Sequence, residues 1–317
     1  MPGSLLQAAH ERRRPLLEAL AQEGTDCYRL FHGVAEGYPG LAVDRYGELL
    51  FVQTFREPLG DEERAAVERA LACWELPVVF RHRPDGPAAP SSLATCHELG
   101  RQLTVRTHHS GLDPYLFLDL RVARRWLAGH HQGSLLNLFA YTCAVGVVAS
   151  GSGSSLNVDF SQRHLEVGAR NARLNQIPAD RFGTLCEDVL PVLRQLAGLP
   201  VKGRGAQRPY KRVEPRQFDT VFLDPPTWSR GRFGAVDIVR DYAALARPAL
   251  LATRPGGRLV ATNHAPEVAL AEWLEGLRRC ALKWGRRIVE VEVLAPDSDF
   301  PSLDGSPPLK IAVLGVS

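Results

Sequence analysis

The chain of 317 residues is 45% hydrophobic and 23% charged and carries a formal net charge of +3. This composition is typical of a globular protein of one large or two modest domains and excludes a disordered or fibrous chain, while the charge is too small to indicate a polyanionic partner by itself. No run approaches 18 apolar residues, and residues 10–14 (His-Glu-Arg-Arg-Arg) stand where a signal peptide would be apolar, so we expect a cytoplasmic protein without a membrane partner.

Residues 1–108 are predicted to form an α+β domain. Leucines and alanines at near-helical spacing predict a helix over 4–22, and a second helix over 61–76 opens on Asp-Glu-Glu. Short apolar runs between Gly-rich turns predict strands at 27–31, 41–44, 49–55 and 78–81. The proline-rich stretch 84–92 is predicted to be a linker.

Residues 109–317 are predicted to form a second domain, in which short apolar runs alternate with helices from residue 134 onward. The expected strands are 135–139, 156–158, 181–185, 220–223 and 258–261, and the expected helices are 144–150, 162–174, 189–197, 236–253 and 267–280. This alternation predicts a parallel, doubly wound α/β sheet. Residues 288–294 and 309–314 are two strands joined without a helix, so we expect an antiparallel pair to close the sheet.

Acidic residues stand where two of these strands end. Asp159 follows the second strand and could accept hydrogen bonds from both hydroxyls of a ribose, and Asp188 follows the third strand, where it could meet an adenine amino group. The alternative is helix capping, although Ser161 is the better N-cap for 162–174. No Gly-x-Gly-x-x-Gly follows the first strand, which disfavours a dinucleotide and favours a nucleoside with a compact charged tail, S-adenosylmethionine.

The most informative stretch is 218–229, in which an apolar strand ends in Asp224, Pro225, Pro226, Thr227 and Trp228. The two prolines hold the backbone near φ −65°, so the carboxylate and the indole are fixed in one geometry. A nucleobase would fit it, with its face on the ring and its edge on the polar groups. A rigid turn that ends a buried strand is the alternative.

Two further patterns concern partners. Residues 202–216 are rich in Gly and Pro and are therefore predicted to form an exposed loop. The loop contains six basic residues: Lys202, Arg204, Arg208, Lys211, Arg212 and Arg216. These residues either contact RNA phosphates or form a solvated face. The six cysteines lie far apart without Cys-x-x-Cys or a Cys/His cluster, so neither a structural metal nor a disulfide framework is expected.

Several segments in this order resemble the class I methyltransferases of 23S rRNA, and within them the guanine-N7 methyltransferase half of the bifunctional 23S rRNA guanine methyltransferase. The resemblance covers nearly the whole chain and is carried by residues 23–30, 42–46, 116–125, 136–142, 171–175, 224–228 and 297–300. It implies a Rossmann-like methyltransferase sheet, 23S rRNA as the partner and S-adenosylmethionine as the donor. It also implies the residues around the donor: Asn137, Phe139 and Tyr141 on the methionine side, Asp159 and Asp188 on the nucleoside, and Phe117, Asp119 and Arg121 as a cover.

The chain departs from the family at two places. Cys143 stands where the family usually has Gly after Tyr-Thr, and a cysteine costs on the order of 1 kcal/mol there if the position has positive φ. Pro114-Tyr115 stand where the family has Thr-Gly.

The nucleophilic side chains that the chain offers indicate which atom of the base accepts the methyl group. A 5-methylcytosine enzyme needs a cysteine thiolate, but the Asp-Pro-Pro-Thr loop has none and the fifth strand ends in Asn263-His264. Guanine N7 carries a lone pair and needs alignment more than it needs a base, so we assign Asp224 and Asn263 to the base edge and Trp228 to its face, with Lys211 and Arg212 on the RNA. The alternative for Asn263 is a polar residue that only ends its strand. His264 could accept a proton, although a lone histidine is more often structural. Two other reactions stay open, methylation of cytosine at C5 and methylation of an exocyclic amine. The chain could also be a catalytically silent RNA-binding assembly factor.

Overall fold

The computed structural model describes residues 2–83, 92–108, 113–201, 209–231 and 233–317. Two compact units are present: unit 1 comprises Met1–Arg121 with Pro296–Pro307, and unit 2 comprises Val122–Ala295 with Pro308–Ser317. The division of the chain into domains at residues 1–108 and 109–317 stays a prediction. The expected linker over 84–92 lies outside the described residues except for Ser92. Among the described residues, no helix has the length and apolar character needed to span a bilayer.

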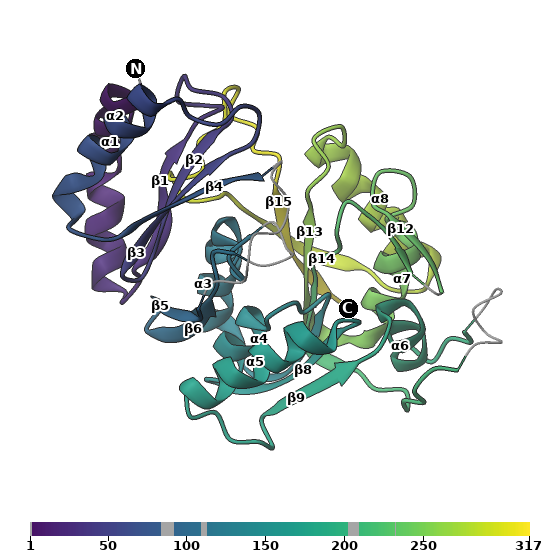
Figure 1. Cartoon of the computed structure of the whole chain (residues 1–317). Coiled ribbons are helices and arrows are strands. Elements are labelled where there is room, and N and C mark those ends of the chain that lie inside the picture. Colours follow the sequence, from purple (N-terminus) through teal and green to yellow (C-terminus); the bar gives the residue numbers. More distant parts are fainter. Residues whose placement is uncertain (1, 84–91, 109–112, 202–208, 232) are drawn as a thin grey trace. The chain divides into compact units, whose positions relative to one another are not determined.

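Unit 1 is built around a four-stranded sheet in the order β1-β2-β3-β4 (Figure 1). Its strands are β1 (Cys27–His32), β2 (Leu41–Tyr46), β3 (Leu49–Thr54) and β4 (Val78–His82), and only β4 runs parallel to its neighbour. Helices α1 (Pro2–Gln22) and α2 (Asp61–Leu71) pack beside each other and supply Leu6, Leu20 and Val67 to the core. The expected elements of this region are therefore confirmed, with the second helix ending at Leu71 in a 3-10 turn, Ala72–Trp74.

The sequence analysis missed the elements that the structure shows between residues 92 and 130. An antiparallel hairpin joins β5 (Ala94–Glu98) to β6 (Arg101–Val105), a 3-10 turn covers Leu118–Leu120, and helix α3 spans Arg121–His130. Helix α3 carries charged residues at most positions of its first half, which hides its apolar face from a periodicity argument.

Unit 2 contains a seven-stranded sheet in the order β14-β15-β13-β10-β7-β8-β9. The parallel strands are β7 (Gly133–Leu138), β8 (Gly153–Asp159), β9 (Phe182–Cys186), β10 (Phe218–Leu223) and β13 (Thr253–Asn263). β15 (Lys310–Val316) pairs antiparallel with both β13 and β14 (Ile288–Leu294). The doubly wound sheet with an antiparallel closing pair is thus confirmed.

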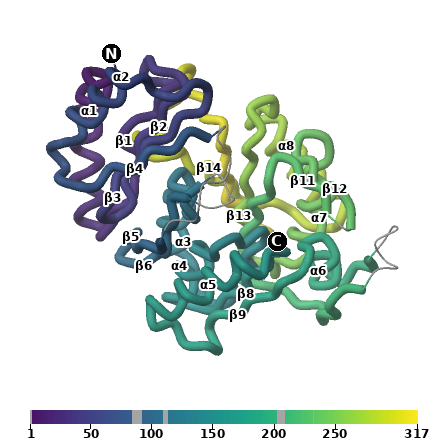
Figure 2. The backbone as a smooth tube through the Cα atoms, viewed as in Figure 1, coloured from purple at the N-terminus to yellow at the C-terminus, as the bar shows by residue number. Residues whose placement is uncertain are grey.

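The helices of unit 2 form two groups. Helices α6 (Val189–Leu196), α7 (Ala243–Ala252) and α8 (Leu270–Lys283) pack side by side, and α4 (Ala144–Ala149) packs on α5 (Gln162–Leu174) (Figure 2). The first group covers an apolar core to which the strands contribute residues such as Leu223 and Leu259.

The helix expected over 236–253 is wrong in its first half. Strands β11 (Trp228–Gly231) and β12 (Gly234–Asp237) pair antiparallel as a hairpin, and α7 begins only after Tyr242. The Asp237 carboxylate accepts the backbone N–H groups of Val239 and Arg240 at 3.2 and 3.0 Å, a local turn that competes with helix formation.

Candidate functional site

The loop after β7 has an unusual backbone. Phe139, Tyr141 and Cys143 have φ values of +57°, +48° and +61°, so three residues that are not glycine alternate into the left-handed region. Such residues cluster at ligand sites when the surroundings enforce them. Cys143 therefore occupies the conformation for which the family's glycine is suited, and it is also the N-cap of α4.

Asp159 at the end of β8 holds this loop in place. Its Oδ2 accepts the backbone N–H of Tyr141 at 2.9 Å and its Oδ1 accepts that of Ser161 at 2.8 Å. Ser161 caps α5 through the N–H of His164, as expected from the sequence. One carboxylate thus joins the ends of β7 and β8, where a parallel sheet binds its ligands.

The other residues expected at the donor in unit 2 have different surroundings. Asn137 is 2% exposed, and its amide donates to Asn157 Oδ1 at 2.9 Å in a buried polar pair. Asp188 caps α6 by accepting the Leu190 N–H at 2.9 Å, the alternative considered from the sequence, and burial raises its pKa. Tyr141 contacts the His164 ring edge-on at 4.3 Å.

The residues expected as a cover lie in unit 1. Arg121 is 1% exposed and binds Asp297 Oδ2 at 2.8 Å and Asp299 Oδ1 at 2.7 Å, so its guanidinium fastens the segment that returns to unit 1. Phe117 is 44% exposed and Asp119 lies in the 3-10 turn. Their contact with a donor stays a prediction.

A carboxylate and an imidazole meet at the ends of β10 and β13. Asp224 Oδ1 accepts from Thr262 Oγ1 at 2.5 Å and lies 2.8 Å from His264 Nε2, which donates in this contact. The sequence analysis considered His264 but not its pairing with Asp224, which depends on the register between two strands. In a parallel pair the carboxyl ends lie at the same edge, so the two side chains converge.

Asn263 is fully buried, and its Oδ1 accepts the Ala265 N–H at 2.9 Å. Its Nδ2 has no hydrogen-bond partner among the described residues. The amide therefore fixes the turn after β13 through its oxygen, and its nitrogen keeps a donor that no described residue uses.

The loop that follows Asp224 exposes its aromatic residue. Pro225 is buried, whereas Pro226 and Thr227 are exposed, and Trp228 opens β11 with 63% of its surface accessible. The Thr227 carbonyl accepts the Ile238 N–H at 3.2 Å, which ties the loop to the end of the hairpin. The backbone beside the indole is thus held by a hydrogen bond, and the indole itself faces solvent.

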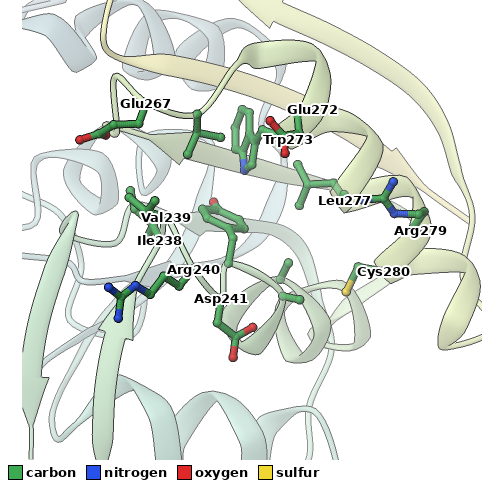
Figure 3. A pocket seen from close by; sticks show the side chains of 15 residues that line it. Ile238, Val239, Arg240, Asp241, Glu267, Glu272, Trp273, Leu277, Arg279 and Cys280 are labelled. Atoms are coloured by element: carbon green, nitrogen blue, oxygen red, sulfur yellow. The ribbon is translucent and has the colours of Figure 1, made fainter.

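A cavity of about 360 Å³ lies between residues 238–243, which follow the hairpin in the sequence, and helix α8 (Figure 3). Figure 3 shows Trp273 and Leu277 of α8 on one side and Ile238 and Val239 on the other. Tyr242, which also lines it, donates its hydroxyl to the Thr262 carbonyl at 2.8 Å and meets Trp273 edge-on at 5.5 Å. None of the residues predicted from the sequence to bind donor or substrate lines this cavity.

The described part of the basic segment carries an aromatic contact. The Arg212 guanidinium lies 4.7 Å from the centre of the Tyr210 ring and donates to its hydroxyl at 2.9 Å, and Tyr210 meets Phe233 of the hairpin loop edge-on at 5.8 Å. Lys211 is exposed, and its backbone N–H donates to Glu187 at 2.9 Å. Lys202, Arg204 and Arg208 lie outside the described residues.

Solved structures share this architecture. The protein SMU.776, determined in complex with SAH, is 20% identical over 99% of this chain and 80% of its own, with a TM-score of 0.79. A SAM-dependent methyltransferase from Agrobacterium tumefaciens is 18% identical over 92% and 90%, with a TM-score of 0.64. The tRNA m1G37 methyltransferase of M. jannaschii is 12% identical over 88% and 76%, with a TM-score of 0.55. At these identities the likeness demonstrates a shared fold, that of the class I methyltransferases.

The sequence itself matches a family model. The model describes S-adenosylmethionine-dependent methyltransferases and covers residues 28–314, which includes unit 2 up to residue 314 and unit 1 from residue 28 onward. S-adenosylmethionine is therefore the cofactor. The chain belongs to the S-adenosylmethionine-dependent methyltransferase family and is an enzyme of that class.

Proposed function

We propose that the enzyme methylates a base of ribosomal RNA, with guanine N7 of 23S rRNA as the acceptor. The observation that carries this proposal is the exposed Trp228, mounted directly after Asp224-Pro225-Pro226-Thr227 at the carboxyl end of β10. An exposed indole beside fixed polar groups suits an unstacked base, which binds by its face and edge. The sequence resemblance adds guanine and its N7 atom.

The donor would lie over the ends of β7 and β8. The Asp159 carboxylate, held by two backbone N–H groups, would meet the ribose hydroxyls, and Asp188 the adenine. Phe139 and Tyr141, in their left-handed conformations, would border the methionine part, and Asn137 would support them from its buried pair with Asn157. Phe117, Asp119 and Arg121 would cover the donor.

Within this site the side chains bind and orient. Guanine N7 has an in-plane lone pair, so alignment with the donor methyl group is the main requirement, and no proton has to leave. The Asn263 Nδ2 and Asp224 Oδ2 would orient the base edge, and Trp228 its face. Lys211 and Arg212 would bind phosphates of the RNA, which is consistent with their exposure.

A second candidate is methylation of a nitrogen that loses a proton, such as guanine N1 or an exocyclic amine. The Asp224–His264 contact favours it, because a carboxylate that accepts from one imidazole nitrogen increases the basicity of the other. The fold is also similar to that of a tRNA m1G37 methyltransferase. Methylation of cytosine C5 has less support, since neither Cys143, at the start of α4, nor Cys186, at the end of β9, belongs to β10 or β13.

The experiment is to incubate the enzyme with labelled S-adenosylmethionine and rRNA from a strain that lacks the gene, and to identify the labelled nucleoside after digestion. We expect 7-methylguanosine from 23S rRNA. Recovery of 1-methylguanosine or an N-methylated amine would replace N7 with the second candidate. Label in 5-methylcytidine, or none in any RNA, would overturn the proposal. Asp224→Ala is the control, and it should incorporate the label more slowly.

A further inference from the structure

Two buried cysteines that are far apart in the sequence meet in unit 1. Cys27 lies in β1 and Cys96 in β5, and both are 0% exposed. Asp26 immediately precedes β1. A carboxylate oxygen of Asp26 and the two Sγ atoms all lie within 4.8 Å of one another. Two thiols and a carboxylate therefore converge on one point at the start of the hairpin β5–β6.

The carboxylate is held in its orientation by the neighbouring strand. Asp26 Oδ1 accepts the His97 backbone N–H at 2.6 Å, and Oδ2 lies 2.9 Å from His97 Nδ1. The Cys27 thiol donates to the His97 carbonyl oxygen at 3.2 Å. Metal-binding carboxylates are commonly oriented by such outer hydrogen bonds, and here the same residue borders both the carboxylate and a thiol.

The spacing suits a zinc ion. Tetrahedral coordination with Zn–S of about 2.3 Å and Zn–O of about 2.1 Å separates neighbouring ligand atoms by roughly 3.5–3.8 Å. The three ligand atoms lie within 4.8 Å, so they need to close by about 1 Å at most, which small side-chain rotations provide. Thiolates with a carboxylate select zinc over magnesium or calcium, which prefer oxygen ligands alone.

A divalent ion would reduce the charge that the group carries. Two thiolates and one carboxylate carry three negative charges, of which a divalent ion neutralises two. Arg121 lies next to the group, since its Nη1 donates to the Cys27 carbonyl at 3.2 Å, but its guanidinium is also paired with Asp297 and Asp299. The metal and its three ligands therefore keep one negative charge.

We propose that Asp26, Cys27 and Cys96 bind one zinc ion that fastens the hairpin β5–β6 to strand β1. The fourth position is taken by water or by the His97 carbonyl oxygen. This site stabilises unit 1 and is independent of the methyl-transfer reaction.

The test uses the full chain, reduced and stripped of metal with a chelator, and titrates it with Co²⁺ and then Zn²⁺ alone. We expect one Co²⁺ per chain with a sulfur-to-cobalt charge-transfer band, which Zn²⁺ abolishes by displacement. Cys27→Ser and Cys96→Ser should each lose most of the band, and Asp26→Asn should keep it with an affinity about 10–100-fold lower. Cys280→Ser, at a buried cysteine of α8, is the matched control and should bind like the native chain.

The titration of the native chain decides the matter even if a variant fails to fold. Absence of the charge-transfer band in the reduced native protein would overturn the proposal. An unchanged band in Cys27→Ser, or its loss in Cys280→Ser, would do the same. Far-ultraviolet circular dichroism identifies the variants that keep the native secondary structure, and only these variants are compared with the native chain in the titration.

Discussion

Cys143 fills the space that Gly168 leaves open on helix α5. A Cβ added at Gly168 would lie 2.8 Å from the Cys143 Cβ and closer still to its Sγ. The side chain at the left-handed position is thus accommodated by a glycine on the facing helix. This pairing explains how the chain tolerates a cysteine where the family usually has glycine.

The Gly168 pairing predicts non-additive stabilities. Gly168→Ala should destabilise the native chain by roughly 2–3 kcal/mol through overpacking, but much less in a Cys143→Gly background. Cys143→Gly alone should change little, because relief of about 1 kcal/mol of backbone strain offsets the lost burial of the thiol. Urea unfolding of the four proteins measures the coupling. Gly276→Ala in α8, where an added Cβ meets nothing, is the control, and strictly additive effects would refute the pairing.

Asp159→Asn should weaken donor binding. An asparagine amide presents one donor group where the carboxylate accepts the N–H groups of Tyr141 and Ser161, so the loop loses a charge-assisted bond of about 1.5–3 kcal/mol. We expect S-adenosylhomocysteine to bind at least about tenfold more weakly by isothermal titration calorimetry. Glu166→Gln, on the exposed face of α5, should bind normally. Equal affinities would show that this end of β8 is not the donor site.

Variants of the Asp224–His264 pair separate the two candidate reactions. Asp224→Ala should lower kcat by roughly 10–100-fold in either case, because an orienting carboxylate is lost. His264→Gln should leave kcat within about threefold if the acceptor is N7, since no proton is removed, but should lower it about 100-fold if a base is required. Thr262→Val, which removes only the other contact of Asp224 Oδ1, is the control. Single-turnover rates with saturating RNA measure the chemical step.

Removing the exposed charges of the basic segment should reduce the salt dependence of RNA binding. If Lys211 and Arg212 each neutralise a phosphate, changing both to Gln lowers the slope of log K against log salt by about 1.4 for single-stranded RNA. The control is the double variant Arg278→Gln and Lys283→Gln, which makes the same change in net charge at two exposed positions of α8. An unchanged slope in the first variant, or an equal loss in the second, would contradict a specific role for Lys211 and Arg212.

The ionised Asp219 carboxylate should stabilise the folded chain at neutral pH, and this stabilisation should be lost in acid. Burial acts to raise its pKa, but hydrogen bonds from Ser134 N and Oγ, at 2.7 and 2.6 Å, and the ion pair with Arg254 hold the pKa below its usual value. A lowered folded-state pKa means that the stabilisation is complete above the unfolded value of about 3.9 and is lost as pH falls through the folded value. Asp219→Asn should therefore cost roughly 1–2 kcal/mol at pH 7, and this deficit should shrink below about pH 4. Asp180→Asn at an exposed position should show neither effect.

The sequence alone determined the architecture and the chemistry of the strand ends. Apolar periodicity is a local property, so the alternation of strands and helices predicted the parallel sheet and its antiparallel closing pair. The same order predicted that Asp159 and Asp188 follow the carboxyl ends of strands, and S-adenosylmethionine was predicted from them and from the missing Gly-x-Gly-x-x-Gly. The first half of the 236–253 helix was wrong because the Asp237 turn is a side-chain effect that apolar periodicity does not record.

Only the tertiary structure decided which side chains meet. The contact of Asp224 with His264 and that of Cys143 with Gly168 depend on register and packing between elements distant in the sequence. For the same reason Cys27 and Cys96, which lack any metal-binding spacing, converge through the approach of β1 to β5. Spacing along a chain describes local geometry, whereas these contacts arise when separate elements bury their apolar faces against each other.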